Sequence, residues 1–425
     1  MEYLKKAQHL EQTVSNEVEK TVKEIISTVK TERDAGVKKY EERFSKSVRA
    51  LRVSEEEIEK SVRSLSYDEK ALIDRVVERI SSFAKAQLEC ISPLEKEFGP
   101  GIHMGHRIVP IEKVGAYIPG GRFPLLSSGP MVVAPAKVAG AKEIVACSPA
   151  NYEGGIHPAV LYGLVRSGAT HIYAIGGAQA IAAMAYGTES VPEVDVIAGP
   201  GNRFVAEAKK QVFGKVGIDL IAGPSEVLVF TDDTADPKKC AADLLAQAEH
   251  DPYARPIMVS TSRTIAEQTI KEVEQFLKEY FSSDSPAHES WAQMGEVIYA
   301  RSLEEGLDIC NDYAIEHLHV HVKDSRKLMD RLHNYGSLFL DSDSSVVFSD
   351  KVSGTNHTLP TLKAARYTGG LWVGNYVKVI THQEITGSGV DFLATHATEQ
   401  SNIEGLEGHR LSAELRLSDK YLYNI

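Results

Sequence analysis

The feature that most constrains the fold is an abrupt change in glycine and proline use near residue 98. Residues 1 to about 98 are rich in Glu, Lys, Val, Ile and Leu at helical spacing and contain almost no Gly or Pro. The cluster Phe98-Gly99-Pro100-Gly101 ends this pattern, because glycine and proline are strong breakers of regular structure. We therefore expect three or four helices before the break, with acidic runs such as residues 55–57 on their solvated faces.

After the break, strand and helix patterns alternate, which indicates an α/β fold. The apolar pattern predicts strands at residues 143–148, 172–175 and 194–197, and helices at residues 131–140 and 157–167. These segments form a first series of strands and helices.

A second α/β series begins with a strand near Val227 and continues with a helix over residues 237–249. Further strands are expected at residues 256–260 and 318–322. His319 and His321 alternate along the last of these strands, and we expect them on one exposed face rather than in a ligand set.

The tail from Leu371 onward is too short to bury a core of its own. It carries a strand pattern near residues 377–381 and helical patterns at residues 392–399 and 406–415. We expect it to dock on another domain or on a partner subunit.

Composition excludes several classes of partner. The 425 residues include 47 basic and 59 acidic side chains, and this net charge of −12 leaves no broad basic face for nucleic acid. No apolar run approaches the roughly 18 residues of a membrane helix, and the first residues lack an apolar signal core, so a cytoplasmic location is expected. The scattered cysteines indicate neither a disulfide framework nor a thiolate zinc site; they are Cys90, Cys147, Cys240 and Cys310.

Glycine-rich turns follow three of the expected strands. They are Pro119-Gly120-Gly121-Arg122, Gly176-Gly177 and Gly199-Pro200-Gly201-Asn202. The last two open helices, a geometry that can offer backbone N–H groups to a phosphate. Neither matches Gly-x-Gly-x-x-Gly, and no acidic residue is obviously placed for a ribose, so a nucleotide site and ordinary tight turns both stay open.

Three polar groups could carry chemistry. Glu316 and His317 are adjacent and could exchange protons near neutral pH, although a solvated loop would also explain them. Gln247 and His250 are three residues apart on one helical face and could share a metal, although a histidine is also favoured by the dipole at a helix end. Residues 349–357 combine hydroxyl, amide, imidazole and carboxylate groups that could orient a small polar ligand, although turn formation explains part of this density.

Eight motifs in order make the chain closely resemble the histidinol dehydrogenase family, from about Val109 to His409. They are Tyr117-Ile-Pro-Gly-Gly, Ala136-Lys-Val-Ala-Gly, Gly176-Gly-Ala-Gln-Ala-Ile-Ala, Gly199-Pro-Gly-Asn, Ala222-Gly-Pro-Ser-Glu-Val, Gln247-Ala-Glu-His, Ala314-Ile-Glu-His-Leu and Ser353-Gly-Thr-Asn-His-Thr-Leu-Pro-Thr.

The resemblance implies a homodimer of α/β subunits, with two incomplete Rossmann-like domains, a helical N-terminal domain and a short C-terminal dimerising tail. The implied boundaries are residues 1–100 for the helical domain, 101–116 with 226–370 for the first Rossmann-like domain, 117–225 for the second, and 371–425 for the tail. The first Rossmann-like domain would hold the metal and the catalytic pair, the second would hold NAD, and the tail would cross to the partner subunit.

The resemblance also implies the site residues. One zinc ion per subunit would be held by Gln247, His250, Asp350 and His409, the last coming from the partner subunit. NAD would lie against Tyr117, Gln179 and Asn202. The substrate would contact Ser225, Gln247, His250, His317, Asp350, His357, Glu404 and His409.

The family reaction oxidises a primary alcohol through an aldehyde to a carboxylate with two NAD⁺. His317 would take the hydroxyl proton as hydride leaves, Glu316 would activate the water that hydrates the aldehyde, and zinc would orient the substrate. The leading substrate is L-histidinol, oxidised to L-histidine in histidine biosynthesis. A catalytically silent nucleotide-binding homologue and a dimer that uses zinc only for folding are alternatives, and the intact Glu316-His317 pair argues against both.

Some positions depart from the usual pattern. Ile315 stands where the family normally has Pro, which should loosen the backbone before the catalytic pair. Arg122-Phe-Pro and the segment from Lys363 look like a related branch that oxidises a sulfonated diol, 2,3-dihydroxypropanesulfonate, to sulfolactate. Lys363 and Arg122 are donors suited to a fixed negative charge. Pro130, however, stands where that branch would be expected to have a His, so its pattern is incomplete.

Overall fold

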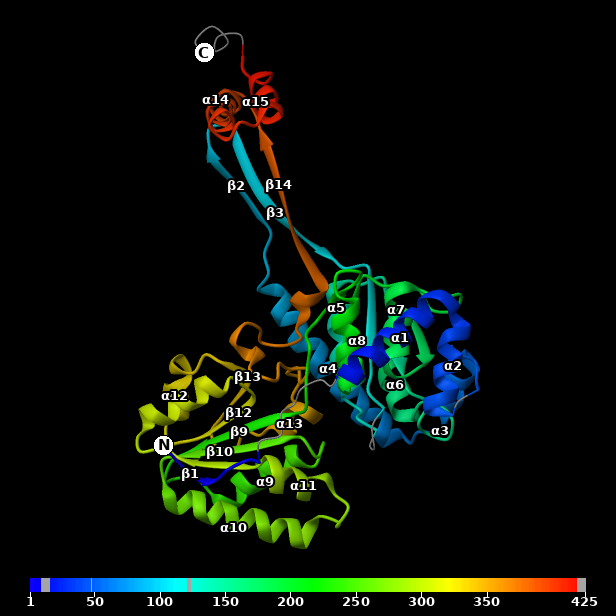
Figure 1. Ribbon diagram of the computed structural model, residues 1–425, viewed down its shortest axis with the longest axis vertical. Coiled ribbons are helices and arrows are strands. Elements are labelled where there is room, and N and C mark those ends of the chain that lie inside the picture. Colours follow the sequence, from blue (N-terminus) through cyan, green and yellow to red (C-terminus); the bar gives the residue numbers. More distant parts are fainter. Residues whose placement is uncertain (9–15, 47, 121–123, 419–425) are drawn as a thin grey trace. The chain divides into compact units, whose positions relative to one another are not determined.

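The computed structural model describes residues 1–425 except residues 9–15, 47, 121–123 and 419–425. The chain forms two compact units (Figure 1). The first contains Met1–Ala86 and Ile111–Tyr376, and the second contains Gln87–Pro110 and Val377–Ile425. The first unit holds a six-stranded and a five-stranded sheet, and the second holds a three-stranded sheet.

Four helices form before residue 98, as the glycine-poor pattern predicts. They are α1 (Asn16–Glu32), α2 (Asp34–Ser45), α3 (Glu55–Ser64) and α4 (Tyr67–Glu89). The acidic run at residues 55–57 forms the first turn of α3, where negative charge is favourable; Glu55 and Glu56 are exposed, whereas Glu57 is half-buried and pairs with Arg49. The Ser54 side chain caps that turn by accepting from the N–H of Glu57. This region also contains a strand that the helical pattern does not reveal, β1 (Glu2–Lys5).

The five-stranded sheet is parallel and has the order β6-β5-β4-β7-β8. Its strands are β4 (Lys113–Tyr117), β5 (Glu143–Ser148), β6 (His171–Ala174), β7 (Val196–Ala198) and β8 (Gly217–Ile218). Its helices are α5 (Ser128–Ala139), α6 (Pro158–Ser167), α7 (Gly177–Tyr186) and α8 (Arg203–Val212). The central strands are apolar and buried, as expected when helices cover both faces of a parallel sheet.

The N-terminal helices share the core of the five-stranded sheet. Val22 and Val29 of α1 are fully buried and pack in one apolar cluster with Ile197 of β7 and Ile181 of α7. The N-terminal helical segment therefore contributes to the core of the first unit.

The six-stranded sheet has the order β1-β11-β10-β9-β12-β13, in which β1 is antiparallel and the other strands are parallel. Its remaining strands are β9 (Glu226–Thr231), β10 (Arg255–Ser260), β11 (Glu296–Tyr299), β12 (Ile315–His321) and β13 (Tyr335–Leu340). The helices of this part are α9 (Pro237–Ala248), α10 (Arg263–Tyr280), α11 (Pro286–Met294), α12 (Leu303–Tyr313) and α13 (Val346–Lys351), with short 3₁₀ segments at Ser325–Arg331, Ala364–Arg366 and Val373–Tyr376.

Both faces of this sheet are covered. Val227 and Val229 of β9 pack in one cluster with α9, α10 and α11, whereas Leu228 and Phe230 pack on the opposite face with α12. Every residue of β12, which lies between β9 and β13, is buried. The prediction that His319 and His321 lie on an exposed face is therefore wrong, because α9 covers the face of β12 that carries them.

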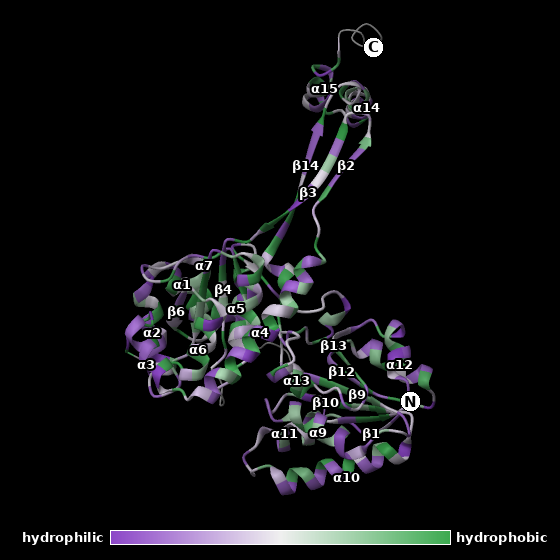
Figure 2. Ribbon diagram, turned by 180° about the vertical axis from the view of Figure 1, so that it is seen from behind, coloured by the Kyte–Doolittle hydropathy of each residue, from purple (hydrophilic) through white to green (hydrophobic). Residues whose placement is uncertain are grey.

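The second unit is an antiparallel sheet with two helices. Its strands are β2 (Leu94–Gly99), β3 (Ile102–Pro110) and β14 (Val377–Ile385), and its helices are α14 (Ser388–Glu404) and α15 (Glu407–Glu414). The strand and helices predicted for the tail are confirmed; β14 and α14 are longer than predicted, and α15 is one residue shorter at each end. Figure 2 colours β14 largely hydrophilic, in agreement with its exposed residues.

The strand pairing differs from the grouping of residues 101–116 with residues 226–370. β3 pairs with β2 and β14, and β4 lies in the five-stranded sheet. The reason is the Gly-Pro-Gly turn, where Gly101 has a φ of +76° and lets the chain reverse between β2 and β3. None of the helices in the described ranges is long and apolar enough to cross a membrane.

Candidate active site

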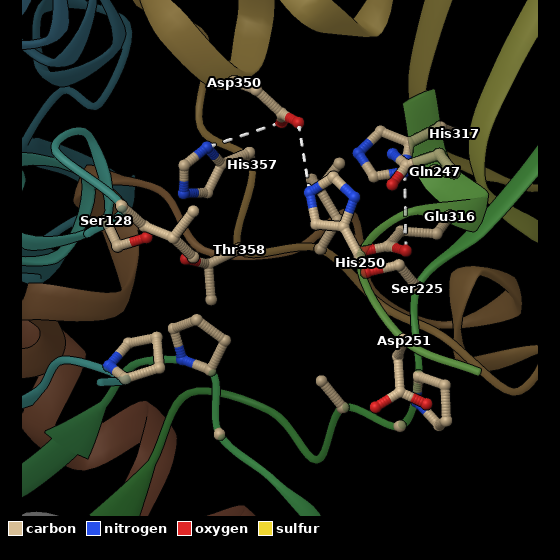
Figure 3. Close-up of a pocket in the computed structure, with 18 of the residues that line it drawn as sticks. Ser128, Ser225, Gln247, His250, Asp251, Glu316, His317, Asp350, His357 and Thr358 are labelled. Atoms are coloured by element: carbon tan, nitrogen blue, oxygen red, sulfur yellow. Dashed lines mark hydrogen bonds and ion pairs between the residues drawn. The ribbon is translucent and has the colours of Figure 1, made fainter. Parts of the chain in front are cut away.

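A cleft of about 570 Å³ in the first unit brings together most of the predicted metal and catalytic residues (Figure 3). Its lining includes Gln247, His250, Glu316, His317 and Asp350. Ser225 and His357, two predicted substrate contacts, also line it. The volume is in the range of clefts that bind small molecules.

The amino ends of parallel strands form one side of this cleft. Ser225 immediately precedes β9, and Glu316 and His317 are the second and third residues of β12. Because α9 connects two parallel strands and runs back across the sheet, its final turn returns to this edge with Gln247. His250 follows in the turn that leads to β10.

The Glu316 carboxylate is held by the neighbouring strand. Its Oε2 atom accepts a hydrogen bond of 2.8 Å from the N–H of Glu226. Glu226 is itself buried and pairs with Arg255 at 2.9 Å. Burial raises the pKa of Glu226 against the opposing effect of Arg255, and the charge of Glu316 raises it further. Two carboxyl groups therefore lie together at the start of β9 and β12.

His317 is buried and its Nδ1 atom faces two acceptors. Nδ1 lies 3.1 Å from the carbonyl oxygen of Glu226 and 3.4 Å from Oε2 of Glu316. These acceptors place the proton on Nδ1, which leaves Nε2 as the basic nitrogen. Nε2 is buried and has no hydrogen-bond partner among the described residues. The amide nitrogen of Gln247, a donor, also lies 3.2 Å from Nδ1. It opposes a proton on Nδ1, but the two oxygen acceptors outweigh this single donor.

The groups around His317 decide its protonation. Burial is the largest single influence and lowers the pKa of His317, but the charge and hydrogen bond of Glu316, the charge of Asp350 and the Glu226 carbonyl together outweigh burial and raise that pKa to about 9. A nearby cation would oppose the protonation of His317 and lower its pKa toward the range of a general base.

Three of the four predicted metal ligands converge on one side of the cleft. Figure 3 shows Asp350 between His250 and His357, and its carboxylate oxygens lie 3.9 Å from Nε2 of His250 and 3.5 Å from Nδ1 of His357. The Oε1 atom of Gln247 is buried without a hydrogen-bond partner in the described structure. An unpaired amide oxygen beside an imidazole and a carboxylate is a donor set that fits a divalent cation such as zinc.

His357 supplies a neutral imidazole next to this donor set. Burial lowers the pKa of His357 below its usual value, although the charge of Asp350 acts in the opposite direction. A neutral imidazole can accept a hydrogen bond from a substrate, which agrees with its predicted role in substrate binding.

The last two of the predicted metal and substrate residues, Glu404 and His409, belong to the second unit. Glu404 is the last residue of α14, and its carboxylate accepts a 2.7 Å hydrogen bond from Gln400. His409 lies in α15, and both side chains are exposed. Their contribution to the site of a partner subunit stays a prediction.

A second cleft of about 430 Å³ contains the three predicted cofactor residues, Tyr117, Gln179 and Asn202. Asn202 and Arg203 line both clefts, so the two cavities are adjacent. The helical N-terminal segment contributes Arg43 and Phe44 to the second cleft. A dinucleotide in this cleft could therefore extend toward His317.

The backbone N–H groups after β6 are already paired. Gly176 donates to Oε1 of Glu41 at 2.9 Å, and Gly177 donates to the Tyr117 hydroxyl at 3.1 Å. The amide nitrogen of Gln179 donates to the same Glu41 oxygen at 2.8 Å. The geometry therefore favours an ordinary tight turn over a phosphate-binding one at this junction. Glu41 was not among the predicted site residues.

The chain was compared with protein-family profiles. The profile described as Histidinol dehydrogenase matches residues 8–417. The chain belongs to the histidinol dehydrogenase family. It is therefore an enzyme of an oxidoreductase family, and both the family resemblance and the α/β fold expected from the sequence are confirmed.

Relatives within the histidinol dehydrogenase family carry different names. A "Histidinol dehydrogenase homolog" of Shouchella clausii is 41% identical over 401 residues, which cover 94% of each chain. A "Sulfopropanediol 3-dehydrogenase" of Ruegeria pomeroyi is 39% identical over 421 residues, 98% of this chain and 96% of its own. The crystal structure of a histidinol dehydrogenase from Elizabethkingia anophelis has a TM-score of 0.91 at 35% identity, covering 96% of this chain and 94% of that one.

The positions that suggest or oppose the sulfonate-acting branch of the histidinol dehydrogenase family, and Ile315, do not line the 570 Å³ cleft in the described part of the chain. Lys363 is exposed, and its Nζ atom lies 3.4 Å from a carboxylate oxygen of Asp312. Arg122 lies outside the described residues. Pro130 is buried within α5, and Ile315 pairs with Tyr335 at the start of β12. The cations that line the 570 Å³ cleft in the described part of the chain are Arg203 and Lys351.

A buried cluster that the sequence did not reveal lies further along β12 from Glu316 and His317. Oδ2 of Asp243 lies 3.1 Å from Nδ1 of His319 and 3.3 Å from Nε2 of His321. The three side chains form a group with metal-ligand chemistry. One signal for it was available, because Asp243 and Gln247 are one helical turn apart on α9 and face the same side.

Proposed function

We propose that this chain oxidises a primary alcohol through an aldehyde to a carboxylate with two NAD⁺ and one zinc ion per subunit, and that L-histidinol is its leading substrate. The observation that carries this proposal is the buried Glu316-His317 pair, whose free imidazole nitrogen lies in a cleft with the unpaired oxygen of Gln247.

In the first step His317 acts as the general base. Its Nδ1–H is directed to the Glu226 carbonyl, which orients the ring and leaves Nε2 free to take the hydroxyl proton. As the O–H bond breaks, a carbon–oxygen double bond forms and a hydride passes to NAD⁺. The products are the aldehyde, NADH and a proton held by His317.

In the second step Glu316 prepares the aldehyde for a further hydride transfer. Its carboxylate accepts a proton from water while the water oxygen bonds to the aldehyde carbon. The aldehyde oxygen takes the proton held by His317, which gives the hydrate. His317 then accepts a hydroxyl proton of the hydrate while a hydride passes to a second NAD⁺, which gives the carboxylic acid. The Glu226 N–H holds the Glu316 carboxylate in place at 2.8 Å.

The donor set of the cleft supports a zinc site. Gln247, His250 and Asp350 would hold the ion together with His409 from the partner subunit. When bound, zinc would orient the substrate and polarise its oxygen. Tyr117, Gln179 and Asn202 would contact NAD, and Ser225, His357 and Glu404 would contact the substrate.

Exposed apolar side chains of the second unit support a homodimer. Ile403 is 88% exposed and Leu415 is 76% exposed, and Phe392, Leu406 and Leu411 are also exposed. Large exposed apolar side chains on and next to α14 and α15 are typical of a surface that a partner covers.

A sulfonated or otherwise anionic diol is the second candidate substrate. Two observations favour it: a relative named sulfopropanediol 3-dehydrogenase matches across 98% of this chain, and Arg203 and Lys351 line the cleft. A fixed negative charge would be stabilised by such cations, and Lys363 would be a further donor.

The experiment follows NAD⁺ reduction by absorbance with L-histidinol and with 2,3-dihydroxypropanesulfonate, before and after chelation. Good turnover of histidinol that is insensitive to Lys351→Ala and Lys363→Ala would exclude the anionic diol. Turnover of the sulfonate alone would exclude histidinol. No reduction with either alcohol by zinc-loaded protein would favour a silent homologue or a purely structural zinc.

A further inference from the structure

A buried carboxylate outside the cleft, Asp243, connects three elements that carry site residues. Asp243 is 8% exposed and lies on α9 one turn before Gln247. Its Oδ1 accepts a 2.6 Å hydrogen bond from the hydroxyl of Ser345, the residue that caps the start of α13. Its Oδ2 faces His319 and His321 of β12.

His319 forms a second connection to α13. Its Nδ1 atom lies 3.1 Å from Asp243, and its Nε2 atom accepts a 3.3 Å hydrogen bond from the N–H of Val346. Nδ1 therefore carries the proton and Nε2 is the acceptor. Burial lowers the pKa of His319, so that the imidazole stays neutral as this arrangement requires.

The charge on Asp243 is well supported. Burial alone would raise the pKa of Asp243, but the adjacent imidazoles of His319 and His321 outweigh burial and hold that pKa well below its usual range. An ionised carboxylate gives stronger hydrogen bonds than a neutral acceptor. Asp243 therefore anchors the start of α13 from two directions.

The anchored helix is short and ends at a predicted zinc ligand. α13 has six residues, Val346–Lys351, and Asp350 is the fifth. A helix of this length spans about 9 Å, so the location of its first turn determines where the Asp350 carboxylate lies. Gln247 lies one turn after Asp243 on α9, so its location also depends on the Asp243 carboxylate.

We propose that Asp243 is a positioning residue that sets the separation of Gln247 and Asp350, and so tunes the zinc affinity of the site. The inference rests on the proposed function, because it concerns the same donor set. Asp243 does not line the cleft and acts through Ser345, His319 and the two helices.

The geometry favours a hydrogen-bond network over a second metal site. Both oxygens of Asp243 and both nitrogens of His319 have partners, and Nδ1 of His321 lies 3.5 Å from the Cys240 sulfur. Of the side-chain nitrogen and oxygen atoms of this cluster, Nε2 of His321 is the one without a hydrogen-bond partner in the described part of the chain. Counting bound metal distinguishes the two arrangements.

The experiment measures the zinc affinity of the purified full-length protein by competition with a chelator of known affinity. Asp243→Asn should weaken zinc binding about 10- to 100-fold, the usual effect of removing a group that supports a metal ligand. Ser345→Ala should give a smaller loss in the same direction, and Ser345→Thr should restore wild-type affinity because it keeps the hydroxyl.

His321→Gln is the matched control. It removes a buried imidazole from the same carboxylate but leaves both connections to α13, so it should lower thermal stability without weakening zinc binding. If Asp243→Asn fails to fold, the Ser345 pair decides the outcome.

Unchanged zinc affinity in folded Asp243→Asn, or in Ser345→Ala, would overturn the inference while leaving the proposed function intact. An equal loss of affinity in His321→Gln would also overturn it. Two zinc equivalents in wild type, one of them lost in both Asp243→Asn and His321→Gln, would replace it with a metal cluster. A wild-type protein that binds no zinc would instead contradict the zinc site of the proposed function.

Discussion

The five-stranded sheet and the parallel strands of the six-stranded sheet present their candidate residues at opposite strand ends. In the five-stranded sheet, Tyr117 ends β4 and Asn202 follows β7, so the cofactor cleft lies at the carboxyl ends, where α/β sheets usually bind ligands. In the six-stranded sheet, Glu316 and His317 lie at the amino end of β12, next to Ser225 before β9. The usual rule therefore locates the cleft of the predicted cofactor residues but not the predicted catalytic pair.

The two strand ends differ in the polar groups that the adjoining turns and helix ends bring to them. The glycine turn after β6 is occupied by Glu41 and Tyr117, so its N–H groups serve the fold. At the amino edge of the six-stranded sheet, the end of α9 brings Gln247 beside His317, and both present unpaired polar atoms. Oε2 of Glu41 and Oε1 of Gln179, beside the glycine turn, also lack hydrogen-bond partners among the described residues. Both edges therefore hold buried polar atoms that a ligand could satisfy, but only the amino edge of the six-stranded sheet adds an acid/base pair.

The largest effects should come from the catalytic pair. His317→Asn should lower the rate of the first hydride transfer on the order of a hundred- to ten-thousand-fold, because it removes the base. Glu316→Gln should slow aldehyde oxidation much more than alcohol oxidation. Single-turnover NADH formation with alcohol and with aldehyde measures both steps, and equal losses in the two steps for Glu316→Gln would remove the assigned roles.

The next prediction tests whether the amino-edge cleft is completed by a partner subunit. Glu316→Ala and His409→Ala chains should each be inactive alone, but mixed dimers should recover part of the activity. One of their two sites would contain both native residues. Activity is measured after the chains are mixed and hybrids are isolated with two affinity tags. Isolated hybrids without activity would contradict a shared site.

A smaller effect is expected in the cofactor cleft. Tyr117→Phe removes the acceptor for the Gly177 N–H and should raise KM for NAD⁺ by about 2- to 13-fold, as expected for one hydrogen bond, with little change in kcat. Tyr173→Phe is the control, because its hydroxyl donates to the carbonyl of Ser190. If Tyr173→Phe changes KM equally, the effect belongs to the sheet rather than to the cleft.

The smallest effect is on stability and concerns the hydrogen bonds between Asp34, at the start of α2, and Ser190, which lies between α7 and β7. Burial would raise the pKa of Asp34, but hydrogen bonds from Ser190 outweigh burial and lower that pKa. Because the pKa of Asp34 is lower in the folded protein than in the unfolded chain, the ionised carboxylate stabilises the fold. This contribution is present above the unfolded pKa of about 4 and is lost as the pH falls through the folded pKa. Asp34→Asn should therefore lower the free energy of unfolding at pH 7 by less than about 1 kcal/mol.

Urea titrations of wild type and Asp34→Asn between pH 2 and pH 7 measure this difference. The two free energies should converge at the acid end. A difference that grows as the pH falls would show that Asp34 acts by another route.

Local patterns predicted much of the fold. The strand at residues 143–148 has the predicted bounds, because a short apolar run between turn signals is a strong local signal. The pairing of β1 with β11 and of β3 with β14 could not be predicted, because such pairs join segments far apart in the sequence. The burial of His319 and His321 was missed for the same reason, since the residue that pairs with them, Asp243, lies on a distant helix.

The site was predicted by chemistry and resemblance rather than by pattern. Gln247, His250, Asp350 and His357 line one cleft with the catalytic pair, although they are spread over more than a hundred residues. Glu226 was not identified, because its role depends on the register between β9 and β12.

The most direct test of the central claim is the number of NADH molecules formed per molecule of alcohol consumed. If the amino-edge pair performs both oxidations, zinc-loaded wild type should form two NADH and one carboxylate. Glu316→Gln should form one NADH and release the aldehyde. One NADH and an accumulating aldehyde from wild type, or two NADH from Glu316→Gln at an unchanged rate, would contradict the account.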